Sequence, residues 1–226
     1  MIHAVNGSVV LIHGLVLDDN RFKALRAIED DFVHRGFAVH KFPWPERFTP
    51  RRVIQALRDP GTEFLAELAD EFNNYLKGLA DKLREGRWVI VAHCLGGSMV
   101  LKWLVTHSQS FLKNHQTLPE AVMIFAALHR CPERAVVLPT GYRARINEKD
   151  GDLDEIVSRL PGRLFVFFAN RDTTALYVNT AFPQQMVEDC LIYQHEISNT
   201  THDEICNMLE SRALVFAHLG LPSPTS

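Results

Sequence analysis

Short apolar runs alternate along the chain with longer segments in which apolar residues recur at helical spacing. The apolar runs are typical of strands buried in a parallel sheet, and they occupy residues 8–12, 37–42, 88–92, 121–127, 163–169 and 191–197. The amphipathic segments predict helices over residues 22–35, 62–84, 96–107 and 203–219. Because strands and helices alternate, the pattern predicts an α/β fold in which helices cover both faces of a mostly parallel sheet.

One long segment does not follow this alternation. Residues 128–161 contain Pro132, Pro139, Gly141 and Gly151 together with a run of charged residues. A loop of this length between two core strands is usually a lid or an insertion. No internal repeat or linker divides the remaining chain. We therefore expect a single domain over residues 1–226, with 128–161 as a small lid or insertion.

Composition and charge narrow the range of partners. The chain has 226 residues with 46% hydrophobic content, which is enough for one sizeable core. Its formal net charge is −3, and no basic patch indicates nucleic acid or an anionic membrane as a partner. The apolar segment at residues 9–17 is interrupted by His13 and Gly14, so it predicts neither a signal peptide nor a membrane span. We expect a cytoplasmic protein, and the sequence leaves its oligomeric state open.

The cysteines show no spacing typical of a metal site or a disulfide framework; they are Cys94, Cys131, Cys190 and Cys206. We therefore expect no metal and no cofactor. A free thiol is compatible with a reducing compartment.

The apolar run 88–92 ends at a cysteine set among small residues. In Ala92-His93-Cys94-Leu95-Gly96-Gly97 the predicted strand stops and a helical pattern begins at once. A nucleophile on a sharp strand-to-helix turn usually has the pattern G-x-S-x-G. Here Ala92 replaces the first glycine and Cys94 replaces the serine. Serine is the commoner residue at this position, so the thiol is either the native nucleophile or a replacement for serine.

Two further residues complete a nucleophilic site. Asp172 follows the strand predicted at 163–169, and His202 follows the strand at 191–197. Because the carboxyl ends of parallel strands meet at one edge of a sheet, we expect both residues to lie near Cys94. The three residue types are those that acyl transfer requires: a nucleophile, a base, and an acid that orients the base. Asp203 is adjacent to His202 and is better placed in the first turn of a helix, and His195 lies within a strand.

The order of nucleophile, acid and histidine resembles that of the α/β-hydrolase superfamily, over nearly the whole chain from Val9 to His202. The resemblance implies that His13-Gly14 opens an oxyanion loop, and that the backbone N–H groups of Leu15 and Leu95 form the oxyanion hole. It also implies that Cys94 attacks a carbonyl while His202 handles the proton and Asp172 orients His202. Dienelactone hydrolases in that superfamily also use a cysteine at this position, and the chemistry is equally that of a thioesterase.

Three functions remain open. The first is hydrolysis of a small acyl ester or thioester through a covalent thioester on Cys94. The second is acyl transfer or cyclisation with a carrier-bound acyl chain, because a thioester reacts well with amines and thiols. The third is a non-catalytic protein with a hydrolase fold that binds a small ligand. His93, Trp44 and Phe48 are candidates for contact with the substrate, although a packing role for each is an equal alternative.

Overall fold

A six-stranded parallel sheet forms the centre of the computed structural model. The structure describes residues 6–14, 23–49, 51–52, 64–84, 86–113, 117–127, 163–172 and 192–224. The strands lie in the order β2-β1-β3-β4-β5-β6, and each pairs in parallel with its neighbours. Their bounds are β1 Gly7–Ile12, β2 Phe37–Lys41, β3 Trp88–His93, β4 Ala121–Phe125, β5 Leu164–Ala169 and β6 Ile192–Ile197. The α/β fold expected from the alternating pattern is confirmed.

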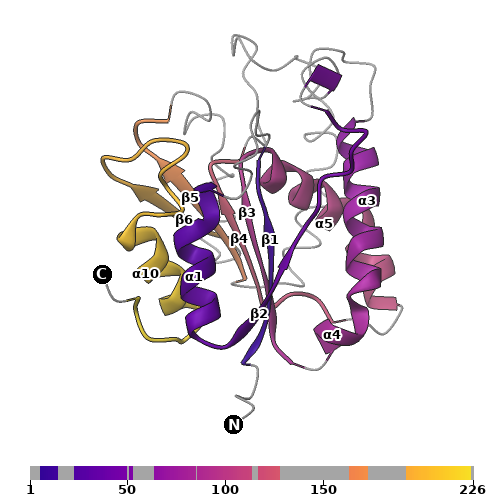
Figure 1. Ribbon diagram of the computed structural model, residues 1–226, viewed down its shortest axis with the longest axis horizontal. Coiled ribbons are helices and arrows are strands. Elements are labelled where there is room, and N and C mark those ends of the chain that lie inside the picture. Colours follow the sequence, from indigo (N-terminus) through magenta and orange to yellow (C-terminus); the bar gives the residue numbers. More distant parts are fainter. Residues whose placement is uncertain are drawn as a thin grey trace.

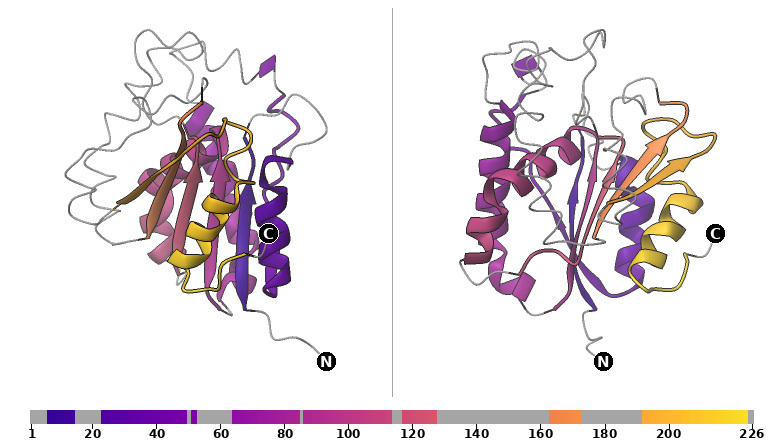
Figure 2. Two further views of the ribbon diagram at one scale, coloured as in Figure 1. Left: turned by 90° about the vertical axis from the view of Figure 1, so that its left-hand side faces the viewer. Right: turned by 180° about the vertical axis from the view of Figure 1, so that it is seen from behind.

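Helices cover both faces of this sheet (Figures 1 and 2). One face carries α1 (Arg26–His34), which follows a short 3-10 turn η1 (Lys23–Leu25), and α10 (Leu209–His218). The other carries α3 (Phe64–Gly78), α4 (Ala80–Arg84) and α5 (Leu95–Lys113). Every residue of the inner strands β1, β3, β4 and β5 is buried, whereas the edge strands β2 and β6 are partly exposed. Coverage on both faces explains why the inner strands have continuous apolar sequences.

Two helices on the α3–α5 face differ in length from the prediction. The segment expected as one helix over 62–84 is two helices, because the chain turns at Leu79 directly after Gly78, a residue that weakens helices. The helix expected over 96–107 runs from Leu95 to Lys113. The hydroxyl of Ser108 donates to the Leu104 carbonyl at 2.6 Å within that extension. The polar residues after His107 therefore did not mark the end of the helix.

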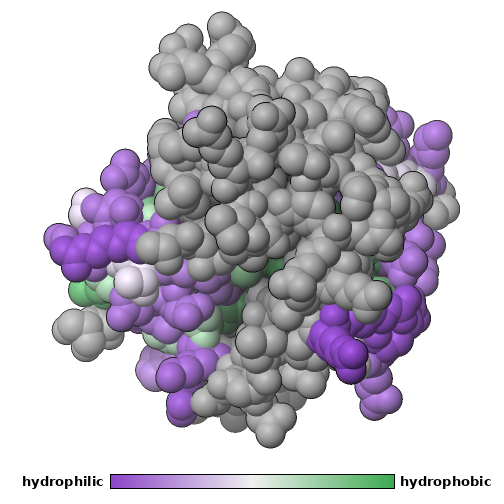
Figure 3. Space-filling view, turned by 90° about the horizontal axis from the view of Figure 1, so that it is seen from above, coloured by the Kyte–Doolittle hydropathy of each residue, from purple (hydrophilic) through white to green (hydrophobic). Residues whose placement is uncertain are grey.

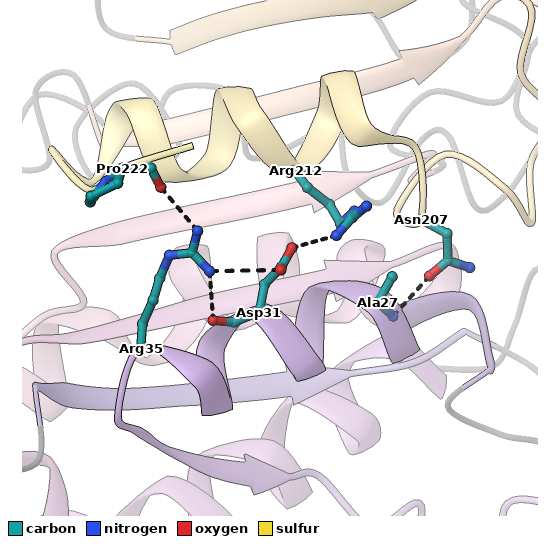
Figure 4. A network of polar contacts seen from close by, with 6 residues as sticks. All are labelled: Ala27, Asp31, Arg35, Asn207, Arg212 and Pro222. Atoms are coloured by element: carbon teal, nitrogen blue, oxygen red, sulfur yellow. Dashed lines mark hydrogen bonds and ion pairs between the residues drawn. The ribbon is translucent and has the colours of Figure 1, made fainter. Parts of the chain in front are cut away.

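The last helix begins later than expected. Residues 202–207 form successive turns, Met208 is extended with φ −62° and ψ 135°, and α10 starts at Leu209 instead of Asp203. The turns allow the side chain of Asn207 to reach α1, where its Oδ1 accepts the backbone N–H of Ala27 at 3.1 Å (Figure 4). Asn207 thus caps a helix that lies 180 residues away in the chain.

A shared carboxylate fastens α1 to α10 (Figure 4). Asp31 Oδ2 accepts from Arg212 at 2.7 Å, and Asp31 also lies 3.7 Å from the guanidinium of Arg35. Arg35 donates in turn to the carbonyl of Pro222 at 3.0 Å, and its guanidinium lies over the ring of Phe216. These contacts tie the first described helix of the chain to the last.

The strands rise from the N-terminal end of the molecule, so their carboxyl ends share one edge of the sheet (Figure 1). Viewed from that edge, hydrophilic described residues gather on the two flanks (Figure 3). No helix among the described residues is both long and apolar enough to cross a membrane. The predicted lid or insertion at 128–161 lies outside the described residues, so the division of the single predicted domain stays a prediction.

Candidate active site

The register of the sheet brings the candidate residues to one edge. Ile12 of β1 lies opposite Ala92 of β3, so the backbone at Gly14 and Cys94 continues past the strand ends side by side. Ala169 of β5 lies opposite Ile197 of β6, and the chain leaves these two ends toward Asp172 and His202. The strand order reverses between β1 and β3, because β2 lies on the far side of β1. Such a reversal is where open α/β sheets bind ligands.

Cys94 occupies a strained turn between β3 and α5. Its φ of 54° lies in the left-handed region, which residues other than glycine rarely adopt. Three backbone hydrogen bonds hold it there: its N–H donates to Phe125 at 2.9 Å, and its carbonyl accepts from Gly97 and Ser98 at 3.0 and 3.3 Å. The thiol, which forms no disulfide, is partly exposed. This is the geometry that the sequence pattern predicts for a nucleophile.

Two glycines allow the chain to pass close to this turn. A Cβ atom at Gly14 would lie 2.5 Å from the Cβ of Cys94 and 3.1 Å from its sulfur. A Cβ atom at Gly96 would lie 2.6 Å from the carbonyl oxygen of His13. His13 and Gly14, which follow β1, therefore run directly against Cys94 and the start of α5, and only glycine fits at either position.

His202, which is partly exposed, forms a pair with the buried Asp172. The Nδ1–H of His202 donates to Asp172 Oδ2 at 2.7 Å, and the side chain of Asp172 has no exposed surface. The two loops are joined by their backbones, since Arg171 N–H donates to the Thr200 carbonyl at 3.1 Å. The thiol of Cys94 also lies close enough to act on the His202 ring, and it raises the pKa of that ring. The predicted set of Cys94, His202 and Asp172 is thus in contact in the order that a catalytic triad requires.

The charge of His202 follows from these partners. Burial by itself lowers its pKa, but the hydrogen bonds and charges of Asp172 and Cys94 outweigh burial and raise the pKa to about 10. His202 is therefore an imidazolium at neutral pH. A positive imidazole in this position can donate a proton to a leaving group.

His93 lies beside this pair, which the sequence alone did not reveal. Its Nε2 is 2.8 Å from the backbone carbonyl of His202, and the two ring centroids are 4.8 Å apart. The side chain is buried, and its pKa is lowered to about 4, chiefly by burial and then by the charge of His202. A contact with substrate at His93 stays a prediction; the contact with the His202 loop is what the structure describes.

The other predicted residues lie around the same edge. Trp44 is buried, and its indole N–H donates to the His13 carbonyl at 3.2 Å, so it supports the loop that leads to Gly14. Phe48 is buried edge to face against Phe64, with ring centroids 5.5 Å apart. A role for Trp44 and Phe48 in substrate binding stays a prediction.

The predicted oxyanion hole is only half described. Leu95 is the first residue of α5, where backbone N–H groups have no acceptor within the helix. Its N–H group follows the nucleophile directly, as the oxyanion role requires. Leu15 lies outside the described residues, directly after Gly14.

One group among the described residues offers ligand atoms close enough to be considered for a metal ion: His93, His202 and Asp203, whose ligand atoms lie within 4.8 Å of one another. A metal here would compete for the imidazole that Asp172 and Cys94 hold. The donor set therefore fits the contacts of His202 with Asp172 and Cys94 better than a resident ion.

Solved structures resemble this chain in fold. TT1662 from Thermus thermophilus is 16% identical, covers 96% of this chain and 89% of its own, and superposes with a TM-score of 0.66. An esterase, Est2, from the Planctomycetes species Thermogutta terrifontis is 12% identical, with 98% and 84% covered and a TM-score of 0.56. XC6422 from Xanthomonas campestris, a member of the α/β serine hydrolases without a lid, is 12% identical, with 98% and 86% covered and a TM-score of 0.56.

No protein-family model and no curated protein sequence matches the chain. At identities this low, structural likeness establishes the fold alone. The parallel sheet, the flanking helices and the solved structures agree, and this chain has the α/β-hydrolase fold.

Proposed function

We propose that the protein hydrolyses a small acyl ester or thioester through a triad of Cys94, His202 and Asp172. The observation that carries this proposal is the continuous contact from Cys94 through His202 to Asp172, built on a nucleophile with a φ of 54°. The resemblance in fold to an esterase and a serine hydrolase supports an ester as the substrate class. The acyl group is free or attached to a carrier.

The reaction proceeds in two steps. The Cys94 thiolate attacks the acyl carbonyl, a C–S bond forms, and the C–O or C–S bond to the leaving group breaks as His202 donates its proton to that group. Water then attacks the thioester while His202 takes a proton from it. The C–S bond breaks, and the acid and the Cys94 thiolate are restored. Asp172 keeps Nδ1 of His202 protonated, which leaves Nε2 to exchange protons with the reacting groups.

The negative oxygen of each tetrahedral intermediate needs donors at the strand edge. Leu95 N–H and Leu15 N–H are the proposed pair. The start of α5 adds the positive end of a helix dipole at the same point. The close approach of Gly14 to Cys94 supports this assignment, because Gly14 is the residue that precedes Leu15 in the chain.

Acyl transfer is the second candidate, and the thiol favours it. A thioester on Cys94 reacts with amines and thiols more readily than a serine ester does, so an acceptor other than water competes well in the second step. Supplying water together with an added amine or thiol, and measuring the ratio of acid to transfer product, separates the two reactions. A ratio of acid to transfer product that falls with acceptor concentration and then levels off supports a binding site for that acceptor.

Intact-mass spectrometry tests the covalent step. The full-length protein is mixed with p-nitrophenyl butyrate and quenched in acid, and we expect a single butyryl adduct that peptide mapping assigns to Cys94. Cys94→Ala should abolish the adduct. Cys206→Ala is the matched control, because Cys206 is the other described free cysteine and is fully buried. Its adduct should form at the wild-type rate.

Two results would contradict the proposal. The first is the absence of any adduct with ester and thioester donors, together with tight binding of an unmodified ligand, which indicates a binding protein. The second is an adduct that persists in Cys94→Ala. Cys94→Ser adds a further comparison: faster turnover than wild type would identify the thiol as a replacement for serine.

A further inference from the structure

We propose that His93 is a positioning residue that holds the backbone of His202 at a fixed distance from the nucleophile. This inference rests on the proposed function for its catalytic consequence. Its geometry stands on one contact, between the side chain next to Cys94 and the main chain of the proposed base.

The contact determines which ring nitrogen of His93 carries the hydrogen. A carbonyl oxygen only accepts, so the Nε2 atom of His93 carries the hydrogen and donates it to His202 at 2.8 Å. The ring also packs beside the His202 ring, with centroids 4.8 Å apart and planes inclined at 53°. His93 therefore touches both the main chain and the side chain of residue 202.

The environment keeps His93 neutral while it donates. Burial and the neighbouring charge of His202 lower the pKa of His93 to about 4, whereas the pKa of His202 is raised to about 10. Across the range between these values the site holds one imidazolium and one neutral imidazole. A lysine or arginine donor at residue 93 would bring a second positive charge against His202 and weaken its bond to Asp172.

The placement of His93 in the fold explains why this contact controls geometry. β3 ends at His93, and Cys94 is the next residue, so one strand end carries both the nucleophile and the group that holds the base. The His202 loop is fastened on one side by Arg171 N–H to Thr200 and on the other by Asn207 to Ala27. Residue 202 lies between those two points, and His93 binds it there.

Three variants test this role. His93→Gln keeps an N–H donor on a side chain long enough to reach the carbonyl, His93→Asn carries the same amide one methylene shorter, and His93→Phe keeps the ring without the donor. We measure kcat and KM with p-nitrophenyl butyrate and the titration of the His202 ring by NMR. The Phe and Asn variants should lose about 10- to 100-fold in kcat with little change in KM, as expected for a misplaced base.

The NMR readout separates positioning from mere packing. With the carbonyl released, His202 should hold its partners less well, and its titration should move down from about 10 in the Phe and Asn variants. The Gln variant should recover most of the rate and the wild-type titration. If the Phe variant fails to fold, the Gln and Asn pair still decides, because both carry the same polar group in the same buried position.

Equal loss in Gln and Asn, or an unchanged His202 titration in all three variants, would overturn the proposal. Failure of the proposed function gives a different pattern. If wild-type protein forms no acyl adduct, that function is lost, and the His202 titration in the three variants then decides the role of His93 alone.

Discussion

Two histidine pairs lie in and directly after strand β6, and the pKa shifts of their histidines run in opposite directions. His202, in the turns after the strand, donates to Asp172 at 2.7 Å and has its pKa raised to about 10. His195, within the strand, has its Nε2 2.8 Å from Nε2 of His218 at the end of α10. The pKa of His218 is lowered to about 4 by burial and by His195, and burial lowers the pKa of His195 too. Between about pH 4 and about pH 10, therefore, His202 keeps its proton and His218 does not.

The difference shows that the partner, more than the burial, sets the charge of a histidine here. Burial lowers the pKa in both pairs, and at His202 the carboxylate of Asp172 and the thiol of Cys94 reverse its effect. Two imidazoles can share a hydrogen bond while at least one ring nitrogen in the contact is unprotonated, so a second proton breaks it. The His195–His218 pair therefore serves packing between β6 and α10, whereas the proposed role of the His202–Asp172 pair is to exchange protons with a substrate.

The largest break in this comparison is Asp172→Asn. An amide cannot hold Nδ1–H of His202 as a carboxylate does, so we expect turnover of p-nitrophenyl butyrate to fall by about 10³- to 10⁴-fold. The pKa of His202 should fall toward the lowered pKa values of the His195–His218 pair. Asp203→Asn is the control, because Asp203 is exposed and adjacent to His202, and it should stay near wild-type activity. Equal losses in the two variants would remove Asp172 from the mechanism.

Activity against pH sharpens the comparison next. His202 loses its proton as pH rises through about 10, so kcat/KM should be level below that pH and fall by about tenfold per unit above it. Cys94→Ala supplies the blank for spontaneous ester hydrolysis. The raised pKa also adds folding stability that is fully present below pH 6.5 and lost as pH rises through about 10. A rate that falls with a midpoint near pH 6.5 would contradict a charged His202.

Stability in acid probes the other pair. The lowered pKa of His218 means that the unfolded chain binds a proton more readily, so stability should fall as pH drops from 6.5 to about 4. In His218→Gln the urea midpoint should change less between pH 7 and 4.5, and His93 accounts for part of the remaining slope. Exposed His34→Gln controls for loss of a histidine. The same pH dependence in both variants would show that His218 carries no penalty.

The smallest expected effect is that of Asn207→Ala, which should alter the surroundings of His202 and leave the His195–His218 pair unchanged. Asn207→Ala removes the acceptor for Ala27 N–H and should lower stability by about 1 kcal/mol, as loss of a helix cap does. Because Asn207 belongs to the His202 loop, activity should fall a few-fold while the acid stability profile keeps its shape. Urea unfolding and kcat measure both. If stability in acid changed while activity stayed intact, Asn207 would be supporting the His195–His218 pair and not the His202 loop, which would contradict this prediction.

The central fold was predictable because strands that are buried on both faces require runs of apolar residues, and such runs are visible in the sequence. The runs that became β1, β3, β4 and β5 are apolar without interruption, and each became a strand buried on both faces. The contact among Cys94, His202 and Asp172 followed from strand ends alone, since parallel strands bring their carboxyl ends together. These predictions depend on periodicity and order, which a single sequence displays.

The parts that were missed depend on long-range contacts. Asp203–Asn207 has a composition compatible with a helix, yet it forms turns, and from these turns Asn207 caps α1, a helix 180 residues away in the chain. His93 looked like a flanking residue, since nothing in the sequence shows that its ring reaches the backbone of residue 202. The roles of Trp44 and Phe48 in substrate binding, and the predicted lid, stay predictions.

The contacts between α1 and α10 can form only late in the synthesis of the chain. Asp31 and Ala27 leave the ribosome long before Arg212 and Asn207, which are 181 and 180 residues further along the chain. Until then α1 lacks its distant cap and the ion pair of Asp31 with Arg212, and Phe32 lacks the Phe216 ring that packs 4.9 Å away. The contacts of α1 with Asn207, Arg212 and Phe216 therefore form only after these late residues have been synthesised.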